Sequence, residues 1–303
     1  KPGVRRDSSL ILPARPLDCG GHGPSDRFPG TPNSRNIVMS DWLHALPVVW
    51  MALVVFGLTY LVAAAIYAAV VSLAARGYAR SFKAVSPGML PPLGIVFGLF
   101  VAFTAAQIWN DNERAEAAVN REAGALRTAI VLSAEFAAEP GDRLRRLIRQ
   151  HIRETVDEEW PMMVHQSATL RFTPHFLPDA LQLTLGLTPD SDGQRVAQRE
   201  ITAAIGNALD ARLQRIIISR SQVNPVKWAC LILQAVCALV AIAMVHSDDR
   251  LAAALMMTIF AAGIGASVLL IAAHDRPFVG DIAVGPGPLL EVMPERTSGR
   301  AGG

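Results

Sequence analysis

The sequence has few charged and few aromatic residues for a chain of 303 residues. Asp, Glu, Lys and Arg make up 18% of it, aromatic residues make up 6%, and the formal net charge is only +2. An average soluble domain contains about 25% charged residues, so this composition is unusual for a protein that folds in water. A nucleic-acid-binding protein is expected to be strongly basic, and the near-neutral balance therefore predicts no nucleic-acid partner.

Cysteines and catalytic motifs are also scarce. The three cysteines, Cys19, Cys230 and Cys237, suggest neither a disulfide framework nor a zinc site. Cys230 and Cys237 lie in an apolar run, where packing is the simplest interpretation. The chain has no G-x-S-x-G turn, no glycine-rich phosphate loop and no C-x-x-C pair. We therefore predict that the protein is not an enzyme and has no catalytic residue, no cofactor and no metal centre.

The beginning of the chain differs from the rest. Residues 1–38 are rich in Pro, Gly, Ser and Arg and show no periodicity, and Met39 then opens a much more apolar segment. A segment of this composition cannot bury enough apolar surface to fold. We interpret residues 1–38 as a disordered or non-native extension that lies outside the fold.

Four long apolar runs dominate the remainder. No charged residue occurs in 45–75 or in 84–110, and two further runs cover 228–246 and 251–273. Each is long enough to cross a bilayer as a helix, which takes about 20 residues. A charge at the centre of such a helix costs about 2.5–3.5 kcal/mol on insertion scales, so runs without charge are a strong signal. We predict a multi-pass membrane protein in contact with the lipid bilayer.

The segment between the second and third runs predicts a helical domain outside the membrane. Its apolar residues repeat at intervals of three and four, which indicates three amphipathic helices. The three stripes are Val119, Ala123, Leu126, Ile130 and Ala134; then Leu144, Ile148, Ile152, Val156 and Trp160; and then Ile201, Ile205, Leu209, Leu213 and Ile217. Glu139–Asp142 predicts a helix break with Asp142 as the N-cap, and Pro161 predicts the end of the second helix.

The predicted fold class is therefore an all-α integral membrane protein with four transmembrane helices and a helical extramembrane domain inserted between helices 2 and 3. We divide the chain into an extension at 1–38, transmembrane helices 1 and 2 at 39–110, the helical domain at 111–225, transmembrane helices 3 and 4 at 226–275, and a C-terminal turn and flexible tail at 276–303. Charge leaves the orientation open. The first loop is cationic, which favours the cytoplasm, but cations also flank the helices on the opposite side.

Two polar groups of the helical domain are expected to be solvated. His151, Glu154 and Glu158 share one face of a predicted helix. Such a face can bind a metal ion and support a hydrolase, but a charged helix face in water is the preferred interpretation. The run 157–159 is likewise interpreted as a solvated acidic patch.

The second apolar run suits either an anchor helix or a pore helix. Its first part holds Pro91, Pro92, Gly94, Ile95, Gly98 and Leu99, and it ends with Gln107, Trp109 and Asn110 before continuing into charged residues. Ile95 and Leu99 share a helix face, and the glycines form a neighbouring row that lets another helix come close. Proton-coupled transporters need ionisable groups in the membrane, which these runs lack, whereas a hydrophobic constriction needs none.

Two motifs add a family resemblance. PPLGIVFGLFVAFTAAQIWNDNERAE at 91–116 resembles the second-helix signature of the bestrophin channels, with an opening proline, a V-x-G-x-x-V core and an aromatic–Asn pair. HDRPFVGDIAVGPGPL at 274–289 resembles the turn after the fourth bestrophin helix, carried by Asp275, Pro277, Phe278, Gly280, Asp281, Pro288 and Leu289. The chain is most similar to a large group of bacterial membrane proteins called bestrophin-like, over about residues 39–293.

This resemblance implies a homopentameric ion channel of the inner membrane with the second helix around the pore and the inserted domain in the cytosol. It implies small inorganic ions, with anions favoured, as the permeant partners. It places the neck at Pro91, Ile95 and Leu99, the pore exit at Gln107, Trp109 and Asn110, and outer-mouth cations at Arg76, Arg80 and Lys83. Of the acidic calcium-binding run found in bestrophins only Asp281 remains, so calcium gating is not expected. The alternative is a membrane-anchored scaffold or sensor that acts through residues 111–227.

Overall fold

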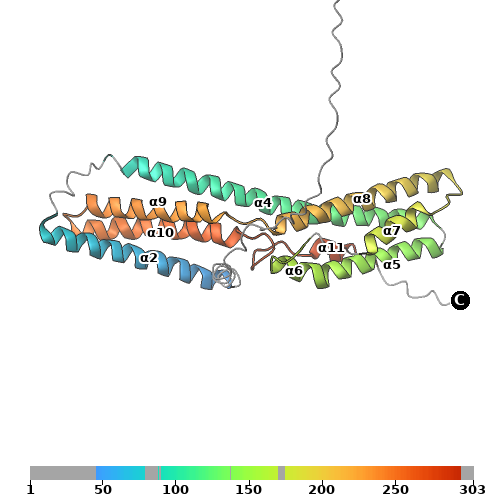
Figure 1. Cartoon of the computed structure of the whole chain (residues 1–303), viewed down its shortest axis with the longest axis horizontal. Helices are drawn as coiled ribbons and strands as arrows, with labels where there is room; N and C mark the ends of the chain where they lie inside the picture. Colours follow the sequence, from blue (N-terminus) through green and yellow to red (C-terminus); the bar gives the residue numbers. More distant parts are fainter. Residues whose placement is uncertain (1–45, 79–87, 89, 137, 170–174, 295–303) are drawn as a thin grey trace, which may run out of the picture.

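The computed structural model describes residues 46–78, 88, 90–136, 138–169 and 175–294, and within these ranges every regular element is a helix (Figure 1). Four helices are long and apolar enough to cross a membrane. They are α2 (Val48–Leu73), α4 (Leu90–Leu132), α9 (Pro225–Val245) and α10 (Arg250–His274). The predicted fold class is confirmed, because a helical region lies between the second and third of these helices. The extension at 1–38, the cations Arg80 and Lys83, and the tail from residue 295 lie outside the described residues.

Each helix of the hairpin formed by α9 and α10 begins at a polar residue that caps it. Asn224 accepts a hydrogen bond from the backbone N–H of Val226 at 2.9 Å. Asp249 accepts hydrogen bonds from the N–H groups of Leu251 and Ala252. These side chains satisfy donors that the first helical turn leaves without partners. The short connection between the two helices makes them an antiparallel hairpin.

Small residues bring α10 close to α2. A Cβ added to Gly265 would lie 2.7 Å from Cδ1 of Phe56 on α2, so a larger residue cannot occupy this position without a shift. A Cβ added to Gly263 would meet nothing within 4 Å. The close packing of α10 on α2 therefore depends on Gly265 rather than on Gly263.

Beyond its apolar part, α4 continues as one helix into the inserted domain (Figure 1). There it packs with α8 (Asp192–Ser219) and α5 (Ala138–Glu154), and α7 (Phe176–Leu185) packs on both of these helices. The predicted stripes supply much of the buried core, including Val119, Leu126, Leu144, Ile148, Ile152, Ile201 and Ile205. Shorter elements complete the domain: η3 (Ser133–Glu135), η4 (Thr155–Glu159), α6 (Trp160–Val164) and α11 (Gly287–Glu291).

Two predicted helix boundaries are wrong, and proline explains both. Helix α5 begins at Ala138 and runs through Pro140, so Asp142 is not its N-cap and instead forms an ion pair with Arg145 at 3.1 Å. Pro161 lies in the first turn of α6, which directly follows the π-helical turn η4. A proline in a first turn removes an N–H that has no intrahelical partner, so it permits a helix to start there.

Candidate functional site

One face of α4 is buried along almost its whole length, and the opposite face is open. Phe97, Thr104, Ile108, Ala115, Leu126 and Ala129 are among its buried residues. An α-helix turns about 100° per residue, so these positions fall within an arc of about 60°. The buried face packs on α9 and α10 in the apolar half and on α8 in the domain half. The open face is therefore continuous from the apolar half into the domain.

The predicted neck residues lie on this open face. Ile95 is 68% exposed and Leu99 is 54% exposed, and both lie about 160–200° around the helix from Phe97. Pro91, which lies one turn before Ile95, is exposed as well. A Cβ added to Gly94 or Gly98 would meet nothing within 4 Å, so the close approach expected at these glycines does not occur within the chain.

The three predicted exit residues divide between two environments. Lys227 at the start of α9 donates a hydrogen bond from Nζ to Oε1 of Gln107. The ring of Trp109 stacks on His274 of α10 with centroids 6.1 Å apart and an interplanar angle of 12°. Asn110 is exposed and continues the face of Ile95 and Leu99. Gln107 and Trp109 thus contact the neighbouring helices of their own chain, while Asn110 lies on the open face.

The turn after α10 connects three separate parts of the chain. Asp275 accepts a hydrogen bond from the N–H of Val223 at 2.6 Å, just before α9. Asp281 accepts a hydrogen bond from the N–H of Val48 at 3.2 Å, and so it caps the start of α2. A carboxylate at a helix N-terminus also interacts favourably with the helix dipole.

The middle of the same turn contacts the inserted domain. Phe278 is 2% exposed and meets Trp160 edge to face, with ring centroids 5.6 Å apart. Pro277 accepts a backbone hydrogen bond from Val284 at 2.8 Å, which closes the turn. Gly280 has a φ of 99°, a conformation that strains any residue with a side chain. The turn therefore fastens the membrane helices to the domain, with glycine required at its bend.

A buried group of charged side chains lies inside the domain, and sequence analysis missed it. Arg215 of α8 is fully buried and donates from Nε to Glu122 of α4 at 2.9 Å and from Nη2 to Glu159 of η4 at 2.6 Å. Arg212 pairs with the other oxygen of Glu159. His151 of α5 is also buried, and its Nε2 lies 3.1 Å from Oε1 of Glu122. We call these five residues the charged cluster.

Paired charges hold the carboxylate of Glu122 ionised. Burial alone raises the pKa of Glu122, but the charge of Arg215 and the hydrogen bond from His151 outweigh burial and lower the pKa to about 2. This residue lies 12 positions beyond Asn110, about 18 Å past the apolar part of α4. Burial alone lowers the pKa of Arg215, but its two carboxylate partners raise it above the ordinary value. Glu122 and Arg215 therefore stay charged over the whole physiological pH range.

The expected solvated faces are wrong for His151 and Glu159, which are 0% and 2% exposed. The apolar stripes of the sequence did contain a signal that charged residues are buried in the domain. Arg212 and Arg215 continue the spacing of Ile201 and Ile205 along α8, and Glu122 falls between core positions of α4. Opposite charges at core positions of two stripes predict a buried ion pair. Among the described residues, no group of three or more His, Cys, Asp and Glu side chains has the arrangement of a metal site.

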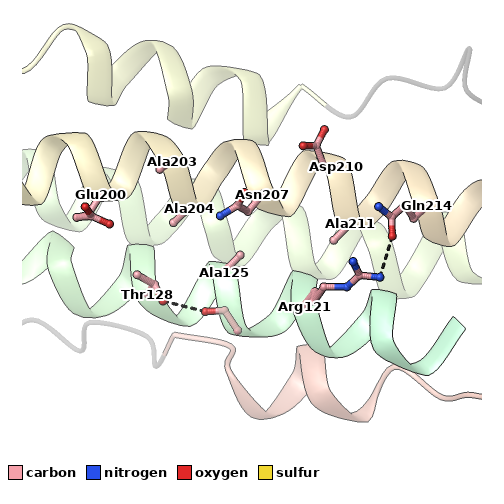
Figure 2. Close-up of a pocket in the computed structure, with 11 residues that line it drawn as sticks. Arg121, Ala125, Thr128, Glu200, Ala203, Ala204, Asn207, Asp210, Ala211 and Gln214 are labelled. Carbon is pink, nitrogen blue, oxygen red and sulfur yellow. Dashed lines mark hydrogen bonds between the residues drawn. The ribbon is translucent and has the colours of Figure 1, made fainter. Parts of the chain in front are cut away.

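A groove of about 570 Å³ runs between α4 and α8 on the outside of the domain (Figure 2). Its floor is formed largely by small residues, namely Gly124, Ala125, Ala203, Ala204 and Ala211. Arg121 crosses between the two helices and donates from Nη2 to Oε1 of Gln214 at 2.8 Å. Glu200, Asn207 and Asp210 supply the other polar groups of the lining. The groove adjoins the open face of α4, since Arg121 and Gly124 belong to both.

Comparison with known proteins gives one match. The family model described as the Bestrophin-like domain matches residues 57–289, a range that runs from α2 to α11. Neither the curated proteins nor the solved structures contain a match to the chain.

Proposed function

The chain belongs to the bestrophin-like family, and from this premise we propose that it is an oligomeric ion channel of the inner membrane whose pore is lined by α4. The chain is a multi-pass membrane protein, because it has four helices that are long and apolar enough to cross a membrane. The observation that carries the proposal is the open face of α4, which bears Ile95 and Leu99. This face lies opposite the one that packs on the rest of the chain, so copies arranged in a ring can direct it toward a common axis.

Rings of Ile95 and Leu99 would form a hydrophobic neck. The two residues are one helical turn apart, about 6 Å along the axis, so the neck would contain two successive apolar rings. Apolar constrictions of this kind gate by excluding water. Below the neck the same face presents Ala102, Ala106, Asn110 and Glu113, all exposed in the chain. The lining thus changes from apolar to polar along the direction in which α4 enters the domain.

Family membership supports a ring, with five copies as the proposed number, a cytosolic domain and no catalytic activity. We propose inorganic anions as the permeant ions. Arg76 is exposed just beyond α2, on the side opposite the inserted domain. A ring of five such cations at the outer mouth would raise the local concentration of anions.

The scaffold alternative has less support from the structure. That alternative assumes that the amphipathic stripes of residues 111–227 bind a helix of another protein. The first two stripes and the first part of the third are instead largely buried against the other helices of the same domain, as at Leu126, Ile148 and Ile205. The end of the third stripe is open, with Leu213 40% and Ile217 55% exposed. Most of these apolar faces are therefore occupied within the chain, and only this end is left for a partner.

Planar-bilayer recording of the purified protein tests the channel proposal. We expect ion current from the wild type and a larger open conductance from Ile95→Ala and Leu99→Ala, because each substitution widens an apolar ring. Leu58→Ala on α2 is the matched control, since Leu58 is 60% exposed on a helix that does not line the proposed pore. A silent wild type with silent neck variants, or equal effects at Leu58 and at the neck, would contradict the proposal.

A further inference from the structure

We infer that the groove between α4 and α8 receives α4 of a second copy of this chain, and that Arg127 of that copy lies against the two acidic residues of the groove, Asp210 and Glu200. The inference rests on the proposed ring and identifies which surfaces of neighbouring copies meet. It goes further than an oligomer as such, because one copy supplies a cation to a groove of the next copy.

The groove suits a helix with a cationic edge. Its floor of glycine and alanine permits close approach of another backbone, and a Cβ added to Gly124 would meet nothing within 4 Å. Of its charged residues, Glu200 and Asp210 are acidic, and Arg121 is already bonded to Gln214 and to the carbonyl of Ala117. Figure 2 shows the carboxylate of Asp210 pointing away from Arg121. The groove therefore presents net negative charge to an incoming surface.

The two flanks of α4 differ in a way that suits a ring. The groove lies on the flank that carries Arg121 and Thr128, about 220–240° around the helix from Phe97. Arg127 and Glu116 lie on the other flank, about 100–120° around, and both are exposed. In a closed ring one surface of each copy meets a different surface of the next. The flank with Arg127 is therefore the one that reaches the groove of the neighbour.

Symmetry then sets the height of Arg127 against the groove. Cyclic symmetry rotates copies without moving them along the axis, so each residue of α4 lies at the same height in every copy. Helices α4 and α8 run antiparallel, since Arg121 bonds Gln214 while Gln194 bonds the carbonyl of Glu135. Interpolated between these two contacts, Asp210 lies level with about residue 124 of α4 and Glu200 with about residue 131, so Arg127 lies between the two acidic residues, about 5–6 Å in height from each.

The apolar half of α4 fits the same arrangement of neighbouring copies. Gly94 and Gly98 lie on the flank of Arg127, and Val96 lies on the groove flank with 54% of its surface exposed. A neighbour related by rotation alone would place Val96 between the heights of Gly94 and Gly98. A branched side chain would then fill the space that the two glycines leave open. The domain half and the apolar half thus favour the same neighbour.

Charge reversal in the full-length protein tests the pairing. The mass of the purified protein in detergent is measured by light scattering over a dilution series. We expect Asp210→Arg and Arg127→Asp each to raise the apparent dissociation constant of the oligomer about tenfold, because each places like charges together. The double variant, with both charges exchanged, is expected to return close to wild type. Arg153→Asp, which reverses an exposed cation of α5, is the matched control.

A disulfide cross-link tests the height of Arg127 relative to the groove of the neighbouring copy. In a chain with Cys19, Cys230 and Cys237 replaced by Ser, Arg127→Cys with Asp210→Cys is expected to give a ladder of covalent oligomers on oxidation. Glu116→Cys with Glu200→Cys, on the same two surfaces but about 22 Å apart in height, is expected not to. A monomeric wild type would overturn both the channel proposal and this inference. An oligomeric wild type that is insensitive to charge reversal and forms no ladder would overturn the groove alone and leave the channel proposal standing.

Discussion

Replacing Arg215 by Met removes the centre of the charged cluster with little change in side-chain volume. Arg215 donates to Glu122 and to Glu159, and its guanidinium carbon lies 5.3 Å from the ring centroid of Trp160. Without Arg215, two buried carboxylates share one remaining arginine, Arg212. Taking one partner out of a buried ion pair leaves an uncompensated charge in a buried site.

The expected loss is large because none of these side chains can reach solvent. Arg215 and Glu122 are both 0% exposed and Glu159 is 2% exposed. Breaking a buried pair in this way costs about 3–5 kcal/mol. For a domain of this size each kcal/mol lowers the midpoint of thermal unfolding by about 2–4 °C, so we expect a decrease of about 10 °C.

Thermal unfolding of the full chain in detergent, followed by circular dichroism, measures this loss. Arg153→Met is the control, because Arg153 is an exposed cation of α5. The double variant Glu122→Gln with Arg215→Met is expected to recover much of the loss, because Glu159 and Arg212 then remain as a balanced pair. Equal midpoints for Arg215→Met and Arg153→Met, or a double variant less stable than Arg215→Met, would refute the reasoning.

Two further predictions concern pH and helix packing. Because the folded pKa of Glu122 is about 2 and its ordinary value is 4.5, the stability that its charge contributes is present above pH 4.5 and is lost as the pH falls toward 2. The difference in unfolding free energy between wild type and Glu122→Gln should shrink by about 3 kcal/mol between pH 5 and pH 2, and a difference independent of pH would argue against the ion pair. In α10, Gly265→Leu should lower the unfolding midpoint by several degrees through its clash with Phe56, while Gly263→Leu should leave it nearly unchanged. Equal effects at the two glycines would show that α10 does not meet α2 at Gly265.

The membrane helices could be predicted from the sequence because their signal is local. A charge-free run of sufficient length requires a bilayer or a large apolar core, and Asn224 and Asp249 mark the starts of α9 and α10. The amphipathic stripes of the inserted domain were predictable for the same reason, since periodicity alone identifies a buried face. Residues such as Ile148 and Ile201 are buried as their spacing predicts.

The stripes place Glu122 and Arg215 at core positions, but the full charged cluster could not be predicted from local patterns, because its members are brought together from four helical elements. Glu122 and Arg215 are separated by 93 residues, so neither segment alone identifies its partner. The environments of Gln107 and Trp109 also depend on contacts with α9 and α10 that no spacing along α4 reveals. The buried face of a helix can be predicted from one segment of sequence. Contacts between distant segments depend on the tertiary packing, which that segment does not reveal.

The unbroken course of α4 has a mechanical consequence. Between Leu90 and Leu132 the helix has no hinge, so the neck and the charged cluster lie on one rigid rod about 65 Å long. Ile95 lies about 40 Å from Glu122 along this rod. If the rod pivots at Glu122, a tilt of about 5° moves Ile95 sideways by about 3.5 Å, more than the radius of a water molecule. A small tilt of α4 imposed by the domain is therefore enough to change the diameter of the neck.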